Sequence, residues 1–226
     1  MNEPIEWLPA SGATEQLMLL LHGVGGDGAS MAPLAQALRA EFPQAALVAP
    51  DGFEPFDGGG RGRQWFSVRG VTEANRPERV AAALPPLAAW VRATQARLRV
   101  APAATALVGF SQGAILALEL AALEDGLVGR VLAFSGRYAR LPETAPRHTT
   151  LHLFHGGADP AMPALHARSA LAHLAAIGGD ATVDIAEGVG HELHPVLLSR
   201  ALHRLRSHIP LRTWQAALGA VPDDDR

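Results

Sequence analysis

The sequence predicts an α/β fold in which a mainly parallel sheet carries helices on both faces. Short apolar segments alternate with longer segments of helical spacing almost throughout the chain. The apolar segments lack the strict alternation of half-exposed strands, which is typical of parallel strands that helices cover on both sides. No repeat, linker or change in composition divides the 226 residues, of which 48% are hydrophobic. We therefore expect a single domain over residues 1–226 with a substantial core.

The predicted strands are short apolar runs that end at glycine or at other turn residues. Their length favours buried strands over helices. They cover residues 16–23, 45–52, 104–110, 129–136, 149–156 and 181–188.

The predicted helices lie between these strands and after the last one. They cover residues 30–42, 76–100, 112–123, 163–178 and 195–209, with a short helix after that through Trp214. Ser30 is expected to cap the first helix, because a serine hydroxyl at a helix start accepts a free backbone N–H. Pro85 and Pro86 are expected to kink or split the second helix, since proline removes a helical hydrogen bond.

Two segments lie outside this alternation. Residues 53–76 combine glycines, arginines and an aromatic pair, and we expect a long surface excursion of the kind that often carries function. The tail 220–226 is expected to be disordered.

Composition excludes several classes of function. The net charge is −3 and no basic stripe is present, so neither a nucleic-acid partner nor a membrane surface is expected. The chain has no cysteine, which excludes disulfides, thiolate metal sites and a thiol nucleophile. No signal peptide is recognisable, and the apolar run "LMLLL" is too short to span a bilayer. We therefore expect a cytoplasmic protein.

The segment "LVGFSQGA" (107–114) places Ser111 between Gly109 and Gly113, after a predicted strand and before a predicted helix. A strand that turns directly into a helix forces the serine into an unfavourable backbone conformation with an exposed hydroxyl. Side chains two residues before and after the serine would collide there, so glycine is needed at both positions. The segment therefore predicts a nucleophile, rather than a structural serine in a tight turn.

Two partners for this serine follow later strands. Functional groups collect at the carboxyl ends of the strands in an open α/β sheet. Asp159 follows the strand at 149–156, and His191 follows the last strand in "GVGHELHP", whereas Asp180 and Asp184 belong to the start and middle of that strand. Serine, aspartate and histidine in this order are typical of an α/β-hydrolase triad, in which the acid orients the imidazole.

The glycine-rich loop "HGVGGDG" predicts half of an oxyanion hole. Acyl transfer needs donors for a developing oxyanion, and we expect the backbone N–H groups of Gln112 and Val24 to supply them. Because the Gln112 donor is its backbone, loss of its side chain is expected to cost much less than loss of Ser111. A phosphate cradle is the alternative, but the loop lacks the endings of a P-loop and of a dinucleotide site.

The two histidines of the segment "HELH" (191–194) are potential zinc ligands. Their spacing differs from that of H-E-x-x-H and the segment is predicted as loop, so neither a metal nor another cofactor is expected. His194 precedes Pro195, which restricts its backbone to an extended conformation at a helix start. We expect His194 to be a cap or a surface residue and His191 to be the base.

Four blocks, "LHGVGGDG", "GFSQGA", "HGGADPAMP" and "GHEL", resemble the signature blocks of the phospholipase/carboxylesterase family, which contains small bacterial carboxylesterases and acyl-protein thioesterases. The resemblance runs over about residues 17–208. The segments "QWFSVRG", "RPERV" and "IPLRTW" look most similar to a bacterial subgroup of YpfH-type esterases.

The resemblance implies an α/β-hydrolase fold and assigns residues to the site. It matches Ser111 to the nucleophile, Asp159 to the acid and His191 to the base. Val24, where leucine is common, and Gln112 match the oxyanion donors. Trp65 and Phe66 match an aromatic pair near the acyl pocket, and Gly23 is expected beside them as a substrate-binding residue. The segment "DPAMP" departs from the two valines that the family often has before the proline, which affects the pocket's shape.

These observations predict a serine carboxylester hydrolase for short- to medium-chain acyl esters. Few residues separate the strands at 129–136 and 149–156, where α/β-hydrolases usually insert a cap, so we expect an open site without a cap domain. An acyl-protein thioesterase or lysophospholipase with the same triad is the alternative, and a non-catalytic binding protein with this fold is a third. The expected partner is a small acyl ester, and a homodimer is left open.

Overall fold

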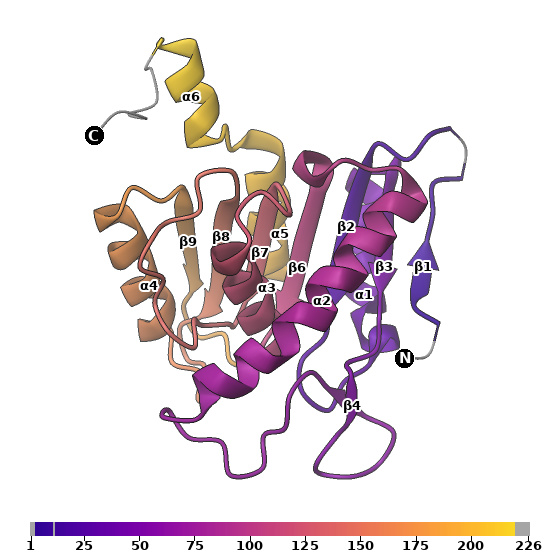
Figure 1. Ribbon diagram of the computed structural model, residues 1–226, viewed down its shortest axis with the longest axis vertical. Helices are drawn as coiled ribbons and strands as arrows, with labels where there is room; N and C mark the ends of the chain where they lie inside the picture. The colour runs from indigo at the N-terminus through magenta and orange to yellow at the C-terminus, as the bar shows by residue number, and fades with distance from the viewer. Residues whose placement is uncertain (1–2, 11, 220–226) are drawn as a thin grey trace.

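The computed structural model describes residues 3–10 and 12–219 and confirms the α/β architecture, while the tail predicted to be disordered lies outside the described residues. Seven strands form one sheet in the order β1-β3-β2-β6-β7-β8-β9 (Figure 1). The strands are β1 (Ile5–Trp7), β2 (Gln16–Leu21), β3 (Ala45–Ala49), β6 (Thr105–Phe110), β7 (Arg130–Phe134), β8 (Thr150–Gly156) and β9 (Ala181–Ala186). Every neighbouring pair is parallel except β1 and β3.

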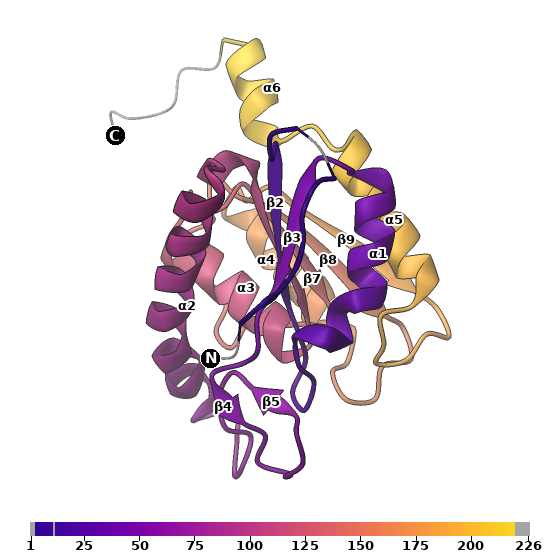
Figure 2. The same cartoon turned by 90° about the vertical axis from the view of Figure 1, so that its right-hand side faces the viewer.

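Helices cover both faces of the sheet (Figure 2). One face carries α2 (Arg76–Leu98), α3 (Gln112–Leu123) and α4 (Leu165–Ala176), and the other carries α1 (Ala32–Glu41) and α5 (Pro195–Ser207). Successive residues of β2 point into different cores: Leu17 and Leu19 pack with the first group of helices, and Met18 and Leu20 with the second. Burial on both faces explains why β2 is apolar without alternation.

The first strand was not predicted from the sequence. β1 has three residues and pairs antiparallel with β3, so that Ile5 lies opposite Ala49. It is half-exposed, and three residues are too few to show the alternation of apolar and polar residues that identifies a strand. Its position therefore depends on the edge that β3 offers, which only the assembled sheet provides.

The helix predicted at 30–42 begins differently from the prediction. Asp27, not Ser30, is the cap: its Oδ1 accepts the Ser30 N–H at 2.9 Å and opens a 3₁₀ turn over Gly28–Met31. Ser30 completes a capping box, and α1 follows from Ala32. The expected Ser30 cap is wrong because Asp27 caps the 3₁₀ turn, and Met31, the N-cap of α1 itself, makes no side-chain cap hydrogen bond.

Of the expected kink or split at Pro85 and Pro86, the split is wrong, since α2 runs as one helix from Arg76 to Leu98. The two prolines and the two residues one turn earlier, Ala81 and Ala82, are exposed. Carbonyl groups that lose their helical partner on this exposed side are accessible to water, which can act as their hydrogen-bond partner. The buried side of the helix keeps its packing against the core.

The segment at 53–76 is an excursion, as predicted, and contains only a two-stranded hairpin, β4 (Glu54–Pro55) and β5 (Arg63–Gln64). It lies at the end of the sheet opposite α6 (Leu211–Ala217) (Figure 1). The connection 135–149 between β7 and β8 holds no helix or strand, and no cap domain is inserted there. Within the described residues, no helix is both long and apolar enough to cross a bilayer.

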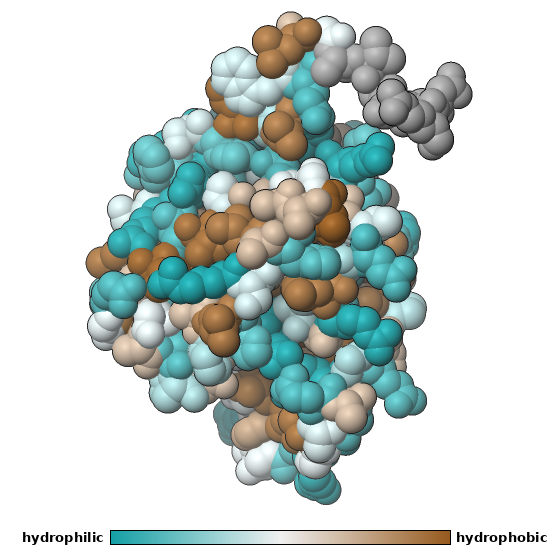
Figure 3. Space-filling model, turned by 90° about the vertical axis from the view of Figure 1, so that its left-hand side faces the viewer, coloured by the Kyte–Doolittle hydropathy of each residue, from teal (hydrophilic) through white to brown (hydrophobic). Residues whose placement is uncertain are grey.

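The segment around α6 carries exposed apolar side chains, and it projects from the body in Figure 3. These are Ile209, Leu211, Trp214 and Leu218. They lie far from the loops at the carboxyl ends of the strands, where the candidate site is found.

Candidate active site

Ser111 lies at a sharp turn between β6 and α3. Its φ of 54° and ψ of −114° put it outside the regions that residues other than glycine normally adopt. Its N–H donates to Phe134 O at 2.9 Å, so the turn is tied to the neighbouring strand β7. The conformation is the strained one predicted for a nucleophile on an elbow, and such strain is typical of functional sites.

The two glycines around Ser111 are sterically required. A Cβ atom on Gly109 would lie 2.5 Å from Gly113 O, which is the predicted collision. A Cβ atom on Gly113 would lie 2.2 Å from Leu21 O on β2. The second contact was not predictable from the sequence, because it depends on β2 and β6 being neighbours in the sheet.

Replacing Gly113 by alanine is expected to lower the free energy of unfolding by about 3 kcal/mol or more, because the new methyl group meets strand backbone that cannot move aside. Gly190→Ala is the matched control, since no atom lies within 4 Å of the Cβ position there. Urea unfolding followed by circular dichroism measures both. Equal stabilities of the two variants would contradict the steric argument.

The structure brings Ser111, Asp159 and His191 together. His191 Nε2 lies 2.9 Å from Ser111 Oγ, and His191 Nδ1 lies 2.7 Å from Asp159 Oδ2. Because an ionised carboxylate only accepts, Nδ1 carries the proton and Nε2 accepts from the serine hydroxyl. Each residue follows a different strand, β6, β8 or β9, at the carboxyl edge of the sheet.

The environment of Asp159 keeps it ionised. The residue is 6% exposed, and burial alone would raise its pKa. Hydrogen bonds to the carboxylate from Met162 N–H at 2.8 Å, from His191 and from Ala161 N–H at 2.9 Å outweigh burial, so the pKa lies below its ordinary value. The departure from the family at "DPAMP" leaves these contacts intact, because two of the three donors are backbone groups.

His155 supports the same turn. Its Nε2 donates to Met162 O at 2.6 Å and lies 3.5 Å from Asp159 Oδ2. Burial lowers its pKa, so the ring is neutral at pH 7. His155 therefore holds the loop that supplies the donors to Asp159. No spacing signal in the sequence distinguishes it from the other histidines.

The other histidine of "HELH" has a separate role. His194 is the N-cap of α5, where its Nδ1 accepts the Val196 N–H at 3.2 Å. The predicted cap is confirmed.

The glycine-rich loop lies beside the nucleophile. A Cβ atom on Gly23 would lie 3.3 Å from Ser111 Cβ and 3.0 Å from the Phe110 ring, so a larger residue would require the Phe110 ring to shift by a few tenths of an ångström. Val24, the next residue, is 38% exposed. The loop therefore lies next to Ser111, and the Val24 backbone donor stays a prediction.

Trp65 and Phe66 are buried, at 2% and 6% exposure. The Trp65 indole N–H donates to His22 O at 2.9 Å, and its ring packs against His22 and Phe53. The substrate-binding role that the resemblance implies for the pair stays a prediction, but neither side chain is exposed on an open surface. The pair instead packs beneath the loops, because an indole and a phenyl ring gain more from the core than from solvent.

Gln112 has a side-chain role that sequence reasoning missed. It is 3% exposed; its Oε1 accepts the Trp65 N–H at 2.8 Å and its Nε2 donates to Phe66 O at 2.7 Å. The available signal was a long polar side chain at the start of the helix "QGAILALELAAL", in which Glu119 is the only other polar or charged side chain. Such a residue at a buried position needs partners.

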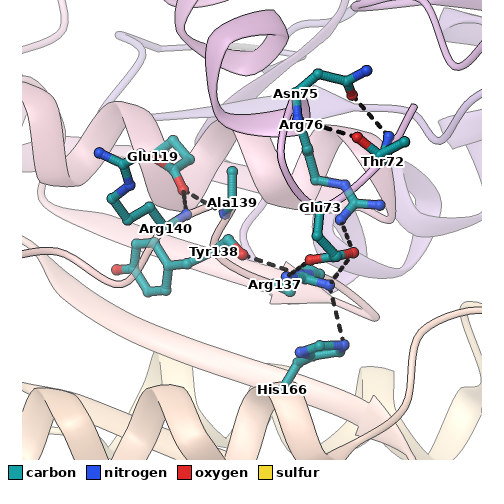
Figure 4. A network of polar contacts seen from close by, with 10 residues as sticks. All are labelled: Thr72, Glu73, Asn75, Arg76, Glu119, Arg137, Tyr138, Ala139, Arg140 and His166. Carbon is teal, nitrogen blue, oxygen red and sulfur yellow. Dashed lines mark hydrogen bonds and ion pairs between the residues drawn. The ribbon is translucent and has the colours of Figure 1, made fainter. Parts of the chain in front are cut away.

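A second anchor holds the far end of the excursion (Figure 4). Arg137, just after β7, lies 2.7 Å and 3.2 Å from the two carboxylate oxygens of Glu73 and 3.2 Å from His166 on α4. Hydrogen bonds from Arg76 and Arg137 lower the pKa of Glu73 to about 2. The excursion is therefore held in its middle, at Trp65 and Phe66, and near its C-terminal end, at Glu73.

Comparison with known proteins identifies relatives of the whole chain. Esterase YpfH of Escherichia coli (strain K12) is 47% identical over 212 residues, which cover 93% of this chain and 91% of that protein. Among solved structures, esterase PE8 has a TM-score of 0.82 at 30% identity and covers 92% of this chain and 99% of its own. A carboxylesterase from Mesorhizobium loti shares the fold, with a TM-score of 0.78 at 22% identity over 91% and 94% of the two chains.

A family model confirms the resemblance seen in the four sequence blocks. The model described as Phospholipase/Carboxylesterase matches residues 7–209. This range includes the nucleophile elbow, the glycine-rich loop and all three residues that meet at the site. The chain therefore belongs to the phospholipase/carboxylesterase family, whose members are hydrolases with the α/β-hydrolase fold.

Proposed function

We propose that this carboxylesterase hydrolyses short- to medium-chain acyl esters through Ser111, His191 and Asp159. The observation that carries the proposal is the pair of hydrogen bonds, 2.9 Å and 2.7 Å, that joins Ser111 to His191 and His191 to Asp159. A serine hydroxyl that is hydrogen-bonded to a histidine base, which is itself hydrogen-bonded to an acid, has the geometry of an activated nucleophile.

The reaction runs in two stages. His191 Nε2 takes the hydroxyl proton as Ser111 Oγ attacks the ester carbonyl, and the protonated imidazole then gives this proton to the leaving alcohol. The acyl-enzyme is hydrolysed when His191 deprotonates a water molecule that attacks the acyl carbon; the bond between this carbon and Ser111 Oγ then breaks, and His191 returns the proton to Ser111 as the acid leaves. The ionised Asp159 holds the imidazole in the correct tautomer and stabilises its charged form.

The tetrahedral intermediates need donors for their oxyanion. We assign these to the backbone N–H of Gln112, at the start of α3, and to that of Val24 in the glycine-rich loop. The closeness of Gly23 to Ser111 supports the second assignment. The positive end of α3 adds to the stabilisation.

A fluorophosphonate probe tests the proposal against a non-catalytic binding protein with the same fold. The protein is expected to be labelled once per chain at Ser111, and boiled protein or Ser111→Ala should not be labelled. Absence of labelling in folded protein would exclude a serine hydrolase.

The acyl preference is expected to favour chains of about two to eight carbons, because no cap domain encloses a long apolar chain. The connection 135–149 holds no helix or strand that would supply such a cover. A series of p-nitrophenyl esters, matched with thioesters of the same acyl groups, measures this preference. A rate that rises steadily to palmitoyl esters, or a strong preference for sulfur leaving groups, would favour a lysophospholipase or acyl-protein thioesterase instead.

The cytoplasmic location stays a prediction that cell fractionation tests. The homodimer left open by the sequence is tested by light scattering of the purified protein.

A further inference from the structure

The Gln112 side chain bridges two segments that are far apart in the sequence. Its carboxamide accepts from Trp65 N–H and donates to Phe66 O, at 2.8 Å and 2.7 Å. The amide is therefore bonded on both sides to adjacent backbone groups of the excursion. A buried amide satisfied in this way holds its partner segment in one position.

The excursion is in turn bonded to the glycine-rich loop. Trp65 Nε1 donates to His22 O at 2.9 Å, and the rings of Trp65 and His22 lie 5.2 Å apart between centroids. Both groups of this hydrogen bond are buried. A continuous path of contacts thus leads from the Gln112 side chain to the residue that precedes Gly23.

His22 fixes the next peptide group. Its Nε2 accepts the Gly52 N–H at 2.8 Å, so the proton of the neutral ring is on Nδ1, which donates to Gly23 O at 2.7 Å. Burial lowers the pKa of His22 and keeps the ring neutral at pH 7. The Gly23–Val24 peptide is trans and planar, so a fixed Gly23 carbonyl also fixes the direction of the Val24 N–H on the opposite side.

We propose that the Gln112 side chain is a positioning group that couples the two halves of the oxyanion hole through Trp65 and His22. The inference rests on the proposed function, since it concerns the two backbone donors assigned there. One residue thus has two roles: its backbone N–H donates to the oxyanion, and its carboxamide sets the position of the loop that carries the second donor.

Two variants test the path at different points. Gln112→Met keeps the length of the side chain but loses both hydrogen bonds, and Trp65→Phe keeps an aromatic ring but loses the bond to His22. Each is expected to lower kcat for a p-nitrophenyl ester about 10- to 100-fold with KM changed less than about threefold, since a displaced donor weakens transition-state binding more than substrate binding. The double variant should be hardly worse than the more impaired single variant, because both act on one path.

The inhibition constant of a boronic acid is the second measurement. Its adduct with Ser111 is tetrahedral and places an oxygen where the oxyanion forms, so both variants should bind it more weakly by about the factor lost in kcat/KM. Rates are divided by the number of sites that a fluorophosphonate titrates, which removes any contribution of unfolded protein.

Gln95→Met is the matched control. Gln95 is also buried and its Nε2 also donates to a backbone carbonyl, Leu127 O at 2.8 Å, but it lies on α2 beside the start of β6. It should lose stability as Gln112→Met does while kcat stays within about twofold, because it is remote from the donors.

The outcomes separate the inference from the proposed function. If Ser111→Ala is inactive while Gln112→Met or Trp65→Phe keeps both kcat and boronic-acid affinity within threefold, the coupling is wrong and the triad stands. If Gln112→Met does not fold, Trp65→Phe alone decides by the same criterion. An active Ser111→Ala would overturn the proposed function, and with it the role given to Gln112.

Discussion

Replacing Ser111 by alanine is expected to abolish turnover while the fold stays intact. Removing the nucleophile of a triad typically lowers kcat by on the order of a millionfold, because no other group can form the acyl-enzyme. Alanine has nearly the volume of serine, and the backbone of the elbow is held by the Ser111 N–H bond to Phe134 O at 2.9 Å, which the variant retains.

Hydrolysis of p-nitrophenyl butyrate measures the activity of Ser111→Ala, and circular dichroism checks its fold. Activity above a few per cent of the wild-type value, in protein free of contaminating esterase, would show that the nucleophile is a different residue. Ser135, which also follows a strand and has a positive φ of 47°, is the serine to substitute next in that case.

Replacing His191 by alanine is expected to be as severe as replacing Ser111. His191 is the residue that contacts both Ser111 and Asp159 through its two ring nitrogens, so its loss removes the base and disconnects the acid. The Ser111/His191 double variant should be hardly worse than either single variant, since residues that act as one unit are strongly non-additive.

His194→Ala is the matched control for the base, from the same loop. Its activity should stay within about tenfold of the wild-type value, a change of at most roughly 1.4 kcal/mol in transition-state stabilisation. Its free energy of unfolding should fall by about 1 kcal/mol, because α5 loses the cap that His194 gives to Val196 N–H. Inactivity of His194→Ala together with an active His191→Ala would move the base to position 194.

The elbow, and the meeting of Ser111, Asp159 and His191 at one site, could be predicted from the sequence because simple rules of strand and turn geometry determine them. Ser111 requires Gly109 and Gly113 wherever a strand turns directly into a helix, and this collision is nearly independent of the rest of the molecule. The carboxyl ends of parallel strands meet at one edge of the sheet, so Asp159 and His191 could be assigned from their strands alone.

Tertiary structure determines the features that neither hydrophobic periodicity nor a local sequence rule predicts. β1 exists because β3 leaves an edge to pair with, and α2 continues through two prolines because that turn faces solvent. Whether Trp65 lines a groove or supports a loop depends on which backbone carbonyl its indole N–H meets, and that carbonyl belongs to His22.

Gln112 shows most clearly which features follow from the sequence and which depend on the tertiary structure. Its place after Ser111 was enough to assign its backbone N–H, since every elbow presents that group in the same direction. The two partners of its side chain lie 46 and 47 residues away. The chain must fold before they meet, because a buried amide is specified by the hydrogen-bonding groups around it and not by its neighbours in sequence.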